Sequence, residues 1–211
     1  MARMTVEQRR DALVTAAHRV IADHGVEGAT TRRVCAQAQM PLASFHYAFE
    51  SRTALLAAVI DQAVPRDLTS LADEIREDTP PGGLVGVERE VAQSFQNMYN
   101  LLVLDPGRLQ ATVSLALYSH NHPELHQAGR QMWDRLCAIA SNTLSTIAAK
   151  HGTSWLKTTD ELGPLLIAAT NAITMTYLTT GDEAMTQDVI AGSSRWMMSY
   201  ASAEAEPDTA P

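Results

Sequence analysis

Hydrophobic residues recur at intervals of three and four along nearly the whole sequence. Val87, Val91, Phe95, Met98 and Leu102, for example, fall on one side of a helical wheel. A period of about 3.6 residues is typical of helices that bury one face. The pattern predicts helices over residues 5–24, 31–38, 41–48, 52–77, 84–104, 106–119, 123–150, 161–180 and 183–203. No stretch shows the period of two that a half-buried strand requires, so we expect an all-α fold of about nine helices.

Residues that begin, bend or end helices fall at the borders of these segments. Ser51 is a suitable N-cap for the fourth helix. Pro65 is expected to kink or split that helix, because proline removes a backbone donor and clashes with the preceding turn. The sequence DTPPGG at residues 78–83 predicts a loop. Asp105 is expected to cap the helix that starts at Pro106.

The sharpest motif lies at residues 30–49. Two short helices separated by a tight break at Gln39 and Met40 make a helix-turn-helix, whose second helix enters the major groove of DNA. Phe45 and Phe49 are four residues apart, so they share one helical face. We expect these two rings to pack on the first helix of the motif and to hold the second one in place.

The outward side chains of this motif are candidate DNA contacts. Small residues such as Ala43 and Ser44 allow a close approach, and Leu42 is suited to a thymine methyl group. Hydroxyl, imidazole and guanidinium groups at the edge are suited to phosphates, although His46 is equally compatible with packing. The candidates are Thr31, Arg32, Arg33, Leu42, Ala43, Ser44, His46, Tyr47 and Arg52.

Charge is distributed unevenly along the chain. The 211 residues carry a formal net charge of -8. Residues 1–52 hold seven arginines against five acidic residues, a balance of +2, so the remainder carries -10. A basic end on an acidic body favours polyanion binding at that end, although chance clustering of a few arginines gives the same balance.

Composition adds expectations about the environment of the protein. Cys35 and Cys137 lie far apart in apolar helical patterns, so we expect buried free thiols rather than a disulfide. The N-terminal segment lacks the long apolar region of a secretory signal, and no run of about 18 uncharged apolar residues predicts a membrane span. We therefore expect a cytoplasmic protein.

Residues 9–59 resemble the DNA-binding domain of the TetR family of transcriptional regulators. The matching residues are Gly25, Thr30-Thr31, Cys35-Ala36, His46-Tyr47 and Phe49-Glu50-Ser51-Arg52 before Leu55-Leu56. The chain departs from the family pattern at the turn, where Gln39 replaces the usual glycine, and at Pro41 and Leu42, which replace polar residues. Because glutamine is poor at positive φ, we expect a tight or strained turn. These departures concern the bases that are recognised rather than the fold.

The resemblance also implies how the rest of the chain is organised. It implies a helix-turn-helix domain at residues 1–52 and a ligand-binding and dimerisation domain at residues 53–203. The fourth helix, about residues 52–77, would link the two, and residues 204–211 would form a disordered tail. The implied effector pocket would be lined by Phe95, Met98, Tyr99, Leu102, Leu115, Tyr118, Met132, Trp133, Leu136, Asn171 and Met175. The implied dimer interface, on the last two helices, would contain Leu165, Ala169, Ile173, Val189, Ser193, Trp196 and Met197. An ordinary core, or packing within one chain, accounts for the same residues.

The sequence therefore predicts a homodimeric repressor that binds a pseudo-palindromic site in double-stranded DNA and is released by a small, mostly apolar effector. An activator or a ligand-independent regulator of the same fold fits the same residues, and an all-α carrier or enzyme is a weaker alternative. No catalytic arrangement stands out, so we expect neither an enzyme nor a cofactor. His120, His122 and His126 lack a matched second cluster, so we expect surface or capping histidines rather than a metal site.

Overall fold

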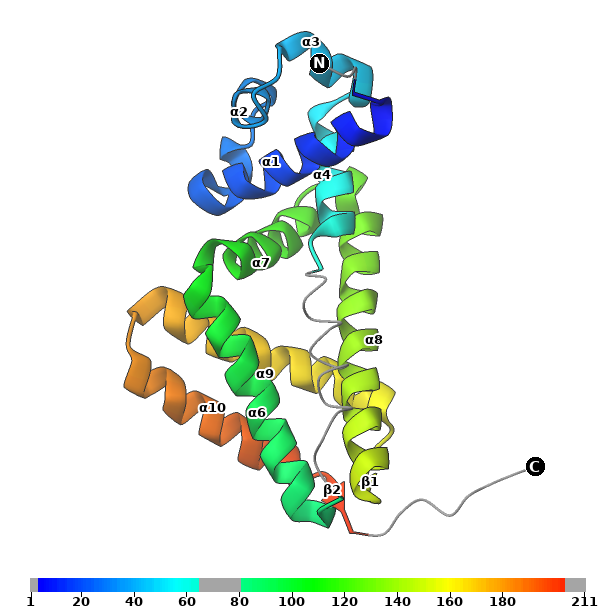
Figure 1. Ribbon diagram of the computed structural model, residues 1–211, viewed down its shortest axis with the longest axis vertical. Coiled ribbons are helices and arrows are strands. Elements are labelled where there is room, and N and C mark those ends of the chain that lie inside the picture. The colour runs from blue at the N-terminus through cyan, green and yellow to red at the C-terminus, as the bar shows by residue number, and fades with distance from the viewer. Residues whose placement is uncertain (1–3, 65–80, 204–211) are drawn as a thin grey trace, which may run out of the picture. The chain divides into compact units, whose positions relative to one another are not determined.

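The computed structural model describes residues 4–64 and 81–203 of the chain (Figure 1). This part is almost entirely helical, which confirms the expected all-α class. The α-helices are α1 (Val6–Gly28), α2 (Thr31–Gln37), α3 (Leu42–Ala48), α4 (Arg52–Gln62), α6 (Gly83–Leu104), α7 (Pro106–His120), α8 (His126–His151), α9 (Thr159–Thr180) and α10 (Glu183–Met198). The expected course of the fourth helix beyond Pro65, the start of the DTPPGG loop and the C-terminal tail lie outside the described residues.

The chain divides into two compact units. Unit 1 comprises Met1–Val64 and Asp105–Asp134, and unit 2 comprises Pro65–Leu104 and Arg135–Pro211. Unit 1 therefore contains α1 to α4, α7, a single 3-10 turn called η1 (Pro123–Leu125) and the start of α8. Residue 52, where we expected a domain border, lies within unit 1, and the division into functional domains stays a prediction.

The core of unit 1 is built around α1. Its buried face carries Leu13, Ala17, Val20 and Ile21, and it packs against α2, α3, α4 and α7. Figure 1 shows α2 and α3 on one side of α1 and α7 on the other. The helix begins with a capping box between Thr5 and Gln8. Gly25, with φ of 72°, interrupts its regular geometry three residues before its end, so the chain turns there toward α2.

Polar contacts join α7 to α1 and α4 inside unit 1. The Thr112 hydroxyl of α7 donates to the carbonyl oxygen of Ala63, at the end of α4, over 3.2 Å. Asp105 makes no cap hydrogen bond to α7, contrary to the prediction. Its carboxylate lies 3.7 Å from the Arg19 guanidinium of α1 instead, because the ion pair draws the side chain away from the helix start. Burial, followed by the positive charge of Arg108, lowers the pKa of His18.

Unit 2 contains two strands that the sequence pattern did not predict. β1 (Ser154–Trp155) and β2 (Ala201–Ser202) form an antiparallel pair of two residues each. Strands this short show no detectable period, so side-chain pattern analysis misses them. They join the segment before α9 to the end of α10, and the Trp155 indole N–H donates to the carbonyl oxygen of Leu144 over 2.9 Å. This contact ties the strand pair to α8.

A buried charged cluster in unit 2 joins α6 to the end of α8. The Glu90 carboxylate lies 2.7 Å from the Lys150 ammonium and 3.0 Å from Nε2 of His151. The Gly82 backbone N–H donates to Nδ1 of His151 over 3.1 Å, which places the imidazole proton on Nε2, facing Glu90. Both partners face Oε1 of Glu90, whereas Oε2 is buried without a hydrogen-bond partner among the described residues.

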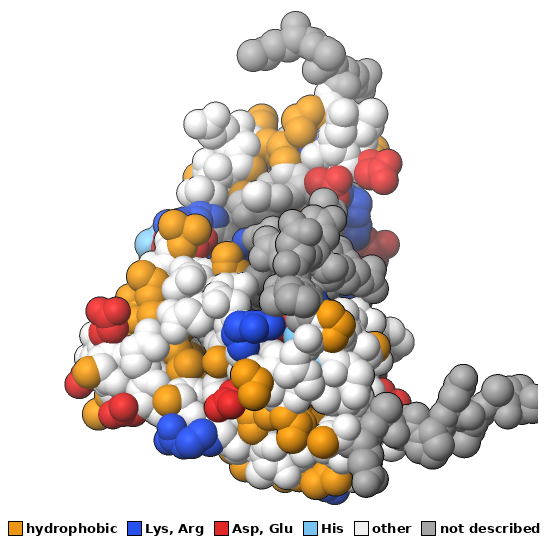
Figure 2. Space-filling view, turned by 60° about the horizontal axis from the view of Figure 1, so that its bottom comes forward, with side chains coloured by type: hydrophobic (Ala, Val, Ile, Leu, Met, Phe, Trp, Pro, Cys, Tyr) orange, Lys and Arg blue, Asp and Glu red, His pale blue; other side chains and the backbone are white. Residues whose placement is uncertain are grey.

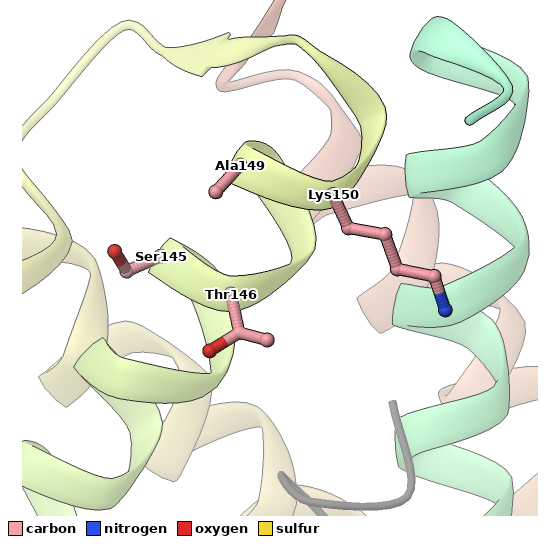
Figure 3. A pocket seen from close by; sticks show the side chains of 4 residues that line it. All are labelled: Ser145, Thr146, Ala149 and Lys150. Atoms are coloured by element: carbon pink, nitrogen blue, oxygen red, sulfur yellow. The ribbon is translucent and has the colours of Figure 1, made fainter. Parts of the chain in front are cut away.

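Lys150 also lines a cavity of about 370 Å³, together with Ser145, Thr146 and Ala149. Figure 3 shows that Lys150 points toward α6, whereas Ser145 and Ala149 point to the opposite side of α8. The polar groups of the described lining residues therefore do not converge on one point. The ammonium belongs to the Glu90 cluster.

Replacing Gly86 by alanine is predicted to destabilise unit 2. A Cβ atom at this position would lie 2.3 Å from Nδ1 of His151, so the imidazole would have to move away from Glu90. Overpacking of this kind costs about 1–3 kcal/mol, measured as the free energy of unfolding in urea. Gly192→Ala is the control, because the nearest atom to its added Cβ is 4.0 Å away. Equal stability of the Gly86→Ala and wild-type proteins would contradict the prediction.

Candidate nucleic-acid interface

The first helix of the motif, α2, is fixed by its cap and by its buried face. The Thr30 hydroxyl accepts a hydrogen bond from the Arg33 backbone N–H, as an N-cap residue does. Val34 and Cys35 are buried. The carbonyl oxygen of Cys35 accepts from the Met40 backbone N–H over 2.8 Å, which closes the turn after α2.

The turn between the two motif helices contains the strained residue that the sequence predicts. Gln39 has φ of 54°, and it is the only residue other than glycine with positive φ among the described residues. The left-handed conformation costs a residue with a Cβ atom roughly 1–2 kcal/mol. The backbone at Gln39 thus adopts the conformation that a glycine would adopt there. The turn between α2 and α3 therefore forms although a glutamine occupies this position.

The second helix, α3, is anchored by the two phenylalanines, as expected. Phe45 and Phe49 are 1 % and 2 % exposed, and their ring centroids lie 5.8 Å apart. Arg10 of α1 adds two contacts, because its guanidinium lies 4.2 Å from the Phe49 ring centroid and donates to the carbonyl oxygen of Ala48 over 2.8 Å. The C-terminal end of α3 is therefore held by apolar packing and by a charged donor.

Most of the predicted DNA contacts lie on the surface of unit 1. Arg32, Arg33, Leu42, Ala43, His46 and Tyr47 are exposed, and Thr31 and Ser44 are half-buried. Tyr47 is 73 % exposed, and the Arg9 guanidinium lies 5.9 Å from its ring centroid. α2 and α3 pack against each other, so these groups come from two adjoining elements of one unit.

Arg52 and Arg33 differ from the other candidates, because both hold the turn between α1 and α2. Arg52 Nε donates to the carbonyl oxygen of Ala29 over 2.9 Å, and Nη2 donates to that of Val26 over 2.5 Å. Arg33 Nη1 donates to the carbonyl oxygen of Gly28 over 2.9 Å. These donors satisfy carbonyl groups at the end of α1 that lack helical partners. A phosphate contact by Arg52 stays a prediction, and the geometry gives this residue a positioning role.

Tyr118 of α7 joins the same network, which the sequence analysis did not predict. Its hydroxyl accepts a hydrogen bond from Arg52 Nη1 over 3.1 Å. Its ring stacks on the His122 imidazole at a centroid distance of 3.7 Å. Arg52 and Tyr118 are 66 residues apart, and no periodic signal in a single sequence connects them.

The histidines near the start of α8 contact backbone carbonyls. His122 Nδ1 lies 2.8 Å from the Tyr118 carbonyl oxygen, and His126 Nε2 lies 2.9 Å from that of His120. Within residues 4–64 and 81–203, no three His, Cys, Asp or Glu side chains form a group able to hold a metal ion. Cys35 and Cys137 form no disulfide in the described part of the chain; Cys35 is buried, as expected, whereas Cys137 is half-buried, contrary to the expectation.

The residues predicted for the effector pocket are distributed over both units. Leu115, Tyr118, Met132 and Trp133 belong to unit 1, and the other seven belong to unit 2. Trp133 and Met175 are exposed on their own units, at 41 % and 50 %. Within unit 2, a cavity of about 470 Å³ is lined by Gln96, Tyr99, Asn100, Val103, Leu104, Tyr177, Gly181, Glu183 and Gln187. Of the predicted residues only Tyr99 lines it, with its ring centroid 5.6 Å from that of Tyr177.

The residues predicted for the dimer interface fall into two groups. Ala169, Ile173 and Met197 are buried within the single chain, so their contacts are with its own side chains. The half-buried or exposed ones are Leu165, Val189, Ser193 and Trp196. The interface itself stays a prediction.

Comparison with known proteins identifies the N-terminal segment. Residues 13–59 match the family model described as bacterial regulatory proteins, tetR family. No curated protein sequence matches the chain. The predicted resemblance to the TetR family is confirmed by this match.

Three solved structures illustrate the likeness over nearly the whole chain. E. coli NemR in its reduced form is 13 % identical, with 87 % of this chain and 95 % of that chain covered and a TM-score of 0.69. A putative transcriptional regulator from Rhodococcus sp. RHA1 is 20 % identical, with 90 % and 95 % covered and a TM-score of 0.69. The multidrug binding protein EbrR, complexed with imidazole, is 20 % identical, with 96 % and 93 % covered and a TM-score of 0.61. At these identities the likeness establishes a common fold.

Replacing Arg52 by lysine is predicted to destabilise unit 1 although the charge is kept. A lysine ammonium lacks the planar fork that reaches Val26, Ala29 and Tyr118 together. Loss of these hydrogen bonds should lower the free energy of unfolding in urea by about 1–3 kcal/mol. Tyr118→Phe removes only the bond to the hydroxyl, so a smaller loss of about 1 kcal/mol is expected. Unchanged stability of the lysine variant would leave Arg52 with a purely electrostatic role.

Proposed function

We propose that this chain is a DNA-binding transcriptional regulator that places α3 in the major groove and Arg32 of α2 near the phosphates. The observation that carries the proposal is the outward face of the motif. Leu42, Ala43, His46 and Tyr47 of α3 are exposed, while Phe45 is buried beneath them. Polar, small and apolar side chains displayed on a rigidly packed second helix are suited to duplex DNA, and the family match covers this same segment.

The regulator is proposed to act as a homodimer through α9 and α10. By length and composition α9 is apolar enough to cross a membrane, with a mean hydropathy of 1.2 over 18 residues, yet only 28 % of that window is buried. Core helices of soluble proteins have the same composition, and a second copy of this chain would cover the apolar surface. Figure 2 shows several small groups of hydrophobic side chains on the face in view, separated by polar side chains and backbone. A two-fold dimer matches a pseudo-palindromic operator.

A small effector is proposed to bind in the body of the protein and to release the dimer from DNA, as in a repressor. Support comes from the cavity beside Tyr99 and Tyr177, which combines aromatic rings with amides and the Glu183 carboxylate. EbrR, which shares the fold, has been solved with imidazole and with proflavin. By linkage, DNA and effector must weaken each other's binding by the same factor. A cytoplasmic location follows from this function.

The DNA-binding proposal predicts a salt-dependent affinity to which Arg32 contributes. Sequences bound by the protein are first selected from random double-stranded DNA, and the dissociation constant is then measured at several salt concentrations. Arg32→Ala should weaken binding at all sequences and reduce the slope of log affinity against log salt by about 0.9, the loss of one phosphate contact. Arg89→Ala, an exposed arginine on α6, is the matched control and should leave the slope unchanged. Failure to enrich any DNA at low salt would refute the function.

The dimer proposal predicts that a charged residue in place of Trp196 dissociates the dimer into monomers. Trp196 is 39 % exposed on α10, so glutamate is tolerated in the monomer but would lie buried and unpaired in an interface. Sedimentation velocity should show a shift from dimer to monomer in Trp196→Glu. The same substitution at Leu156, which is 68 % exposed before α9, serves as the control and should leave the dimer intact. A dimer that persists in Trp196→Glu would place the interface elsewhere.

A further inference from the structure

The outward surface of α3 begins with two adjacent apolar residues. Leu42 is the first residue of the helix and is 41 % exposed, and Ala43 beside it is exposed as well. Pro41, the N-cap residue, adds a third apolar side chain to this surface. We call Leu42 and Ala43 the apolar ridge of α3. It stands at the N-terminal end of the helix, the part that contacts base edges in helix-turn-helix proteins.

The position of the ridge is fixed by the packing behind it. Phe45 is buried one turn further along the same short helix, and the Ser44 backbone N–H donates to the carbonyl oxygen of Pro41 over 2.9 Å. The fixed φ of Pro41 restricts the backbone at the start of the helix. Leu42 is therefore a large, exposed apolar side chain on a helix that is fixed by packing. It does not belong to the core of unit 1.

The seven residues of α3 lack the groups that recognise most bases through paired hydrogen bonds. The helix sequence LASFHYA contains no Arg or Lys for guanine, no Asn or Gln for adenine and no Asp or Glu for cytosine. Its polar groups are the Ser44 hydroxyl, the His46 imidazole and the Tyr47 phenol. Gln39, in the turn before the helix, carries the nearest side-chain amide in the sequence.

The major groove displays one apolar group, the C5 methyl of thymine. We propose that the apolar ridge of α3 recognises thymine methyl groups, so that Leu42 and Ala43 select for thymines in each half of the operator. This inference rests on the proposed function, because it requires α3 to enter the major groove. According to this inference, apolar contacts of Leu42 and Ala43 recognise bases that other proteins recognise through hydrogen-bonding side chains.

The test removes the methyl group from the DNA and the apolar side chain from the protein. Duplexes recovered by selection are resynthesised with deoxyuridine in place of each thymidine, which deletes the C5 methyl and keeps base pairing. At contacted positions, wild-type protein should bind the deoxyuridine duplex about fourfold more weakly per methyl group, the effect of exposing one such group. Leu42→Ala should discriminate less between the two duplexes than the wild-type protein does, and the discrimination that is left would come from Ala43.

Two controls separate this inference from the proposed function. Leu84→Ala, at a leucine 37 % exposed in the first turn of α6, should keep the wild-type ratio between the thymidine and deoxyuridine duplexes. Tyr47→Phe should weaken both duplexes equally if its hydroxyl contacts phosphate. Circular dichroism and thermal unfolding confirm that each variant is folded. Tight binding that is insensitive to deoxyuridine, or selected half-sites without thymine, would overturn the methyl recognition and leave DNA binding intact. Absence of any DNA binding would instead refute the proposed function.

Discussion

The burial of Phe45 and Phe49 is the constraint on which the proposed DNA-binding surface depends. α3 is only seven residues long, too short to be stable by itself. The two rings supply the packing that holds it against α1 and α2, and Arg10 reinforces the contact through the Phe49 ring and the Ala48 carbonyl oxygen. Because this helix is held from one side, its other side is free to carry residues chosen for recognition.

Much of this arrangement was predictable from the sequence, because it depends on neighbours along the chain. The i, i+4 spacing of Phe45 and Phe49 predicts their shared face, and Thr30 and Ser51 cap α2 and α4 as their positions suggest. The strain at Gln39 follows from the mismatch between a glutamine and a turn that favours glycine. Local steric and hydrogen-bonding preferences dominate in each of these cases, and they are visible in a single sequence.

The contacts that the sequence did not predict join residues far apart in the chain. The role of Arg52 is one example. A basic residue after a helix cap suggests phosphate binding. In the structure, however, the Arg52 guanidinium donates hydrogen bonds to one oxygen atom of α1, one of the turn after α1 and one of α7. Asp105 is another, because an ion pair with Arg19 replaces the expected cap. Whether such a side chain contacts a neighbour in the sequence or a distant residue depends on tertiary packing. A periodic sequence pattern gives no information about that packing. The same reason applies to Tyr118, whose partner lies on α4.

The buried thiol of Cys35 has a consequence for how the motif can be observed. Burial raises the pKa of this thiol, an effect that a hydrogen bond with the Phe45 backbone partly offsets. Since the thiolate is the reactive form, the native motif keeps Cys35 chemically inert. Cys35 is 3 % exposed, so alkylation of its sulfur requires the packing around it to open locally, and the alkylation rate would report how often this opening occurs. The Cys35 thiol can therefore serve as a probe of transient unfolding in the helix-turn-helix.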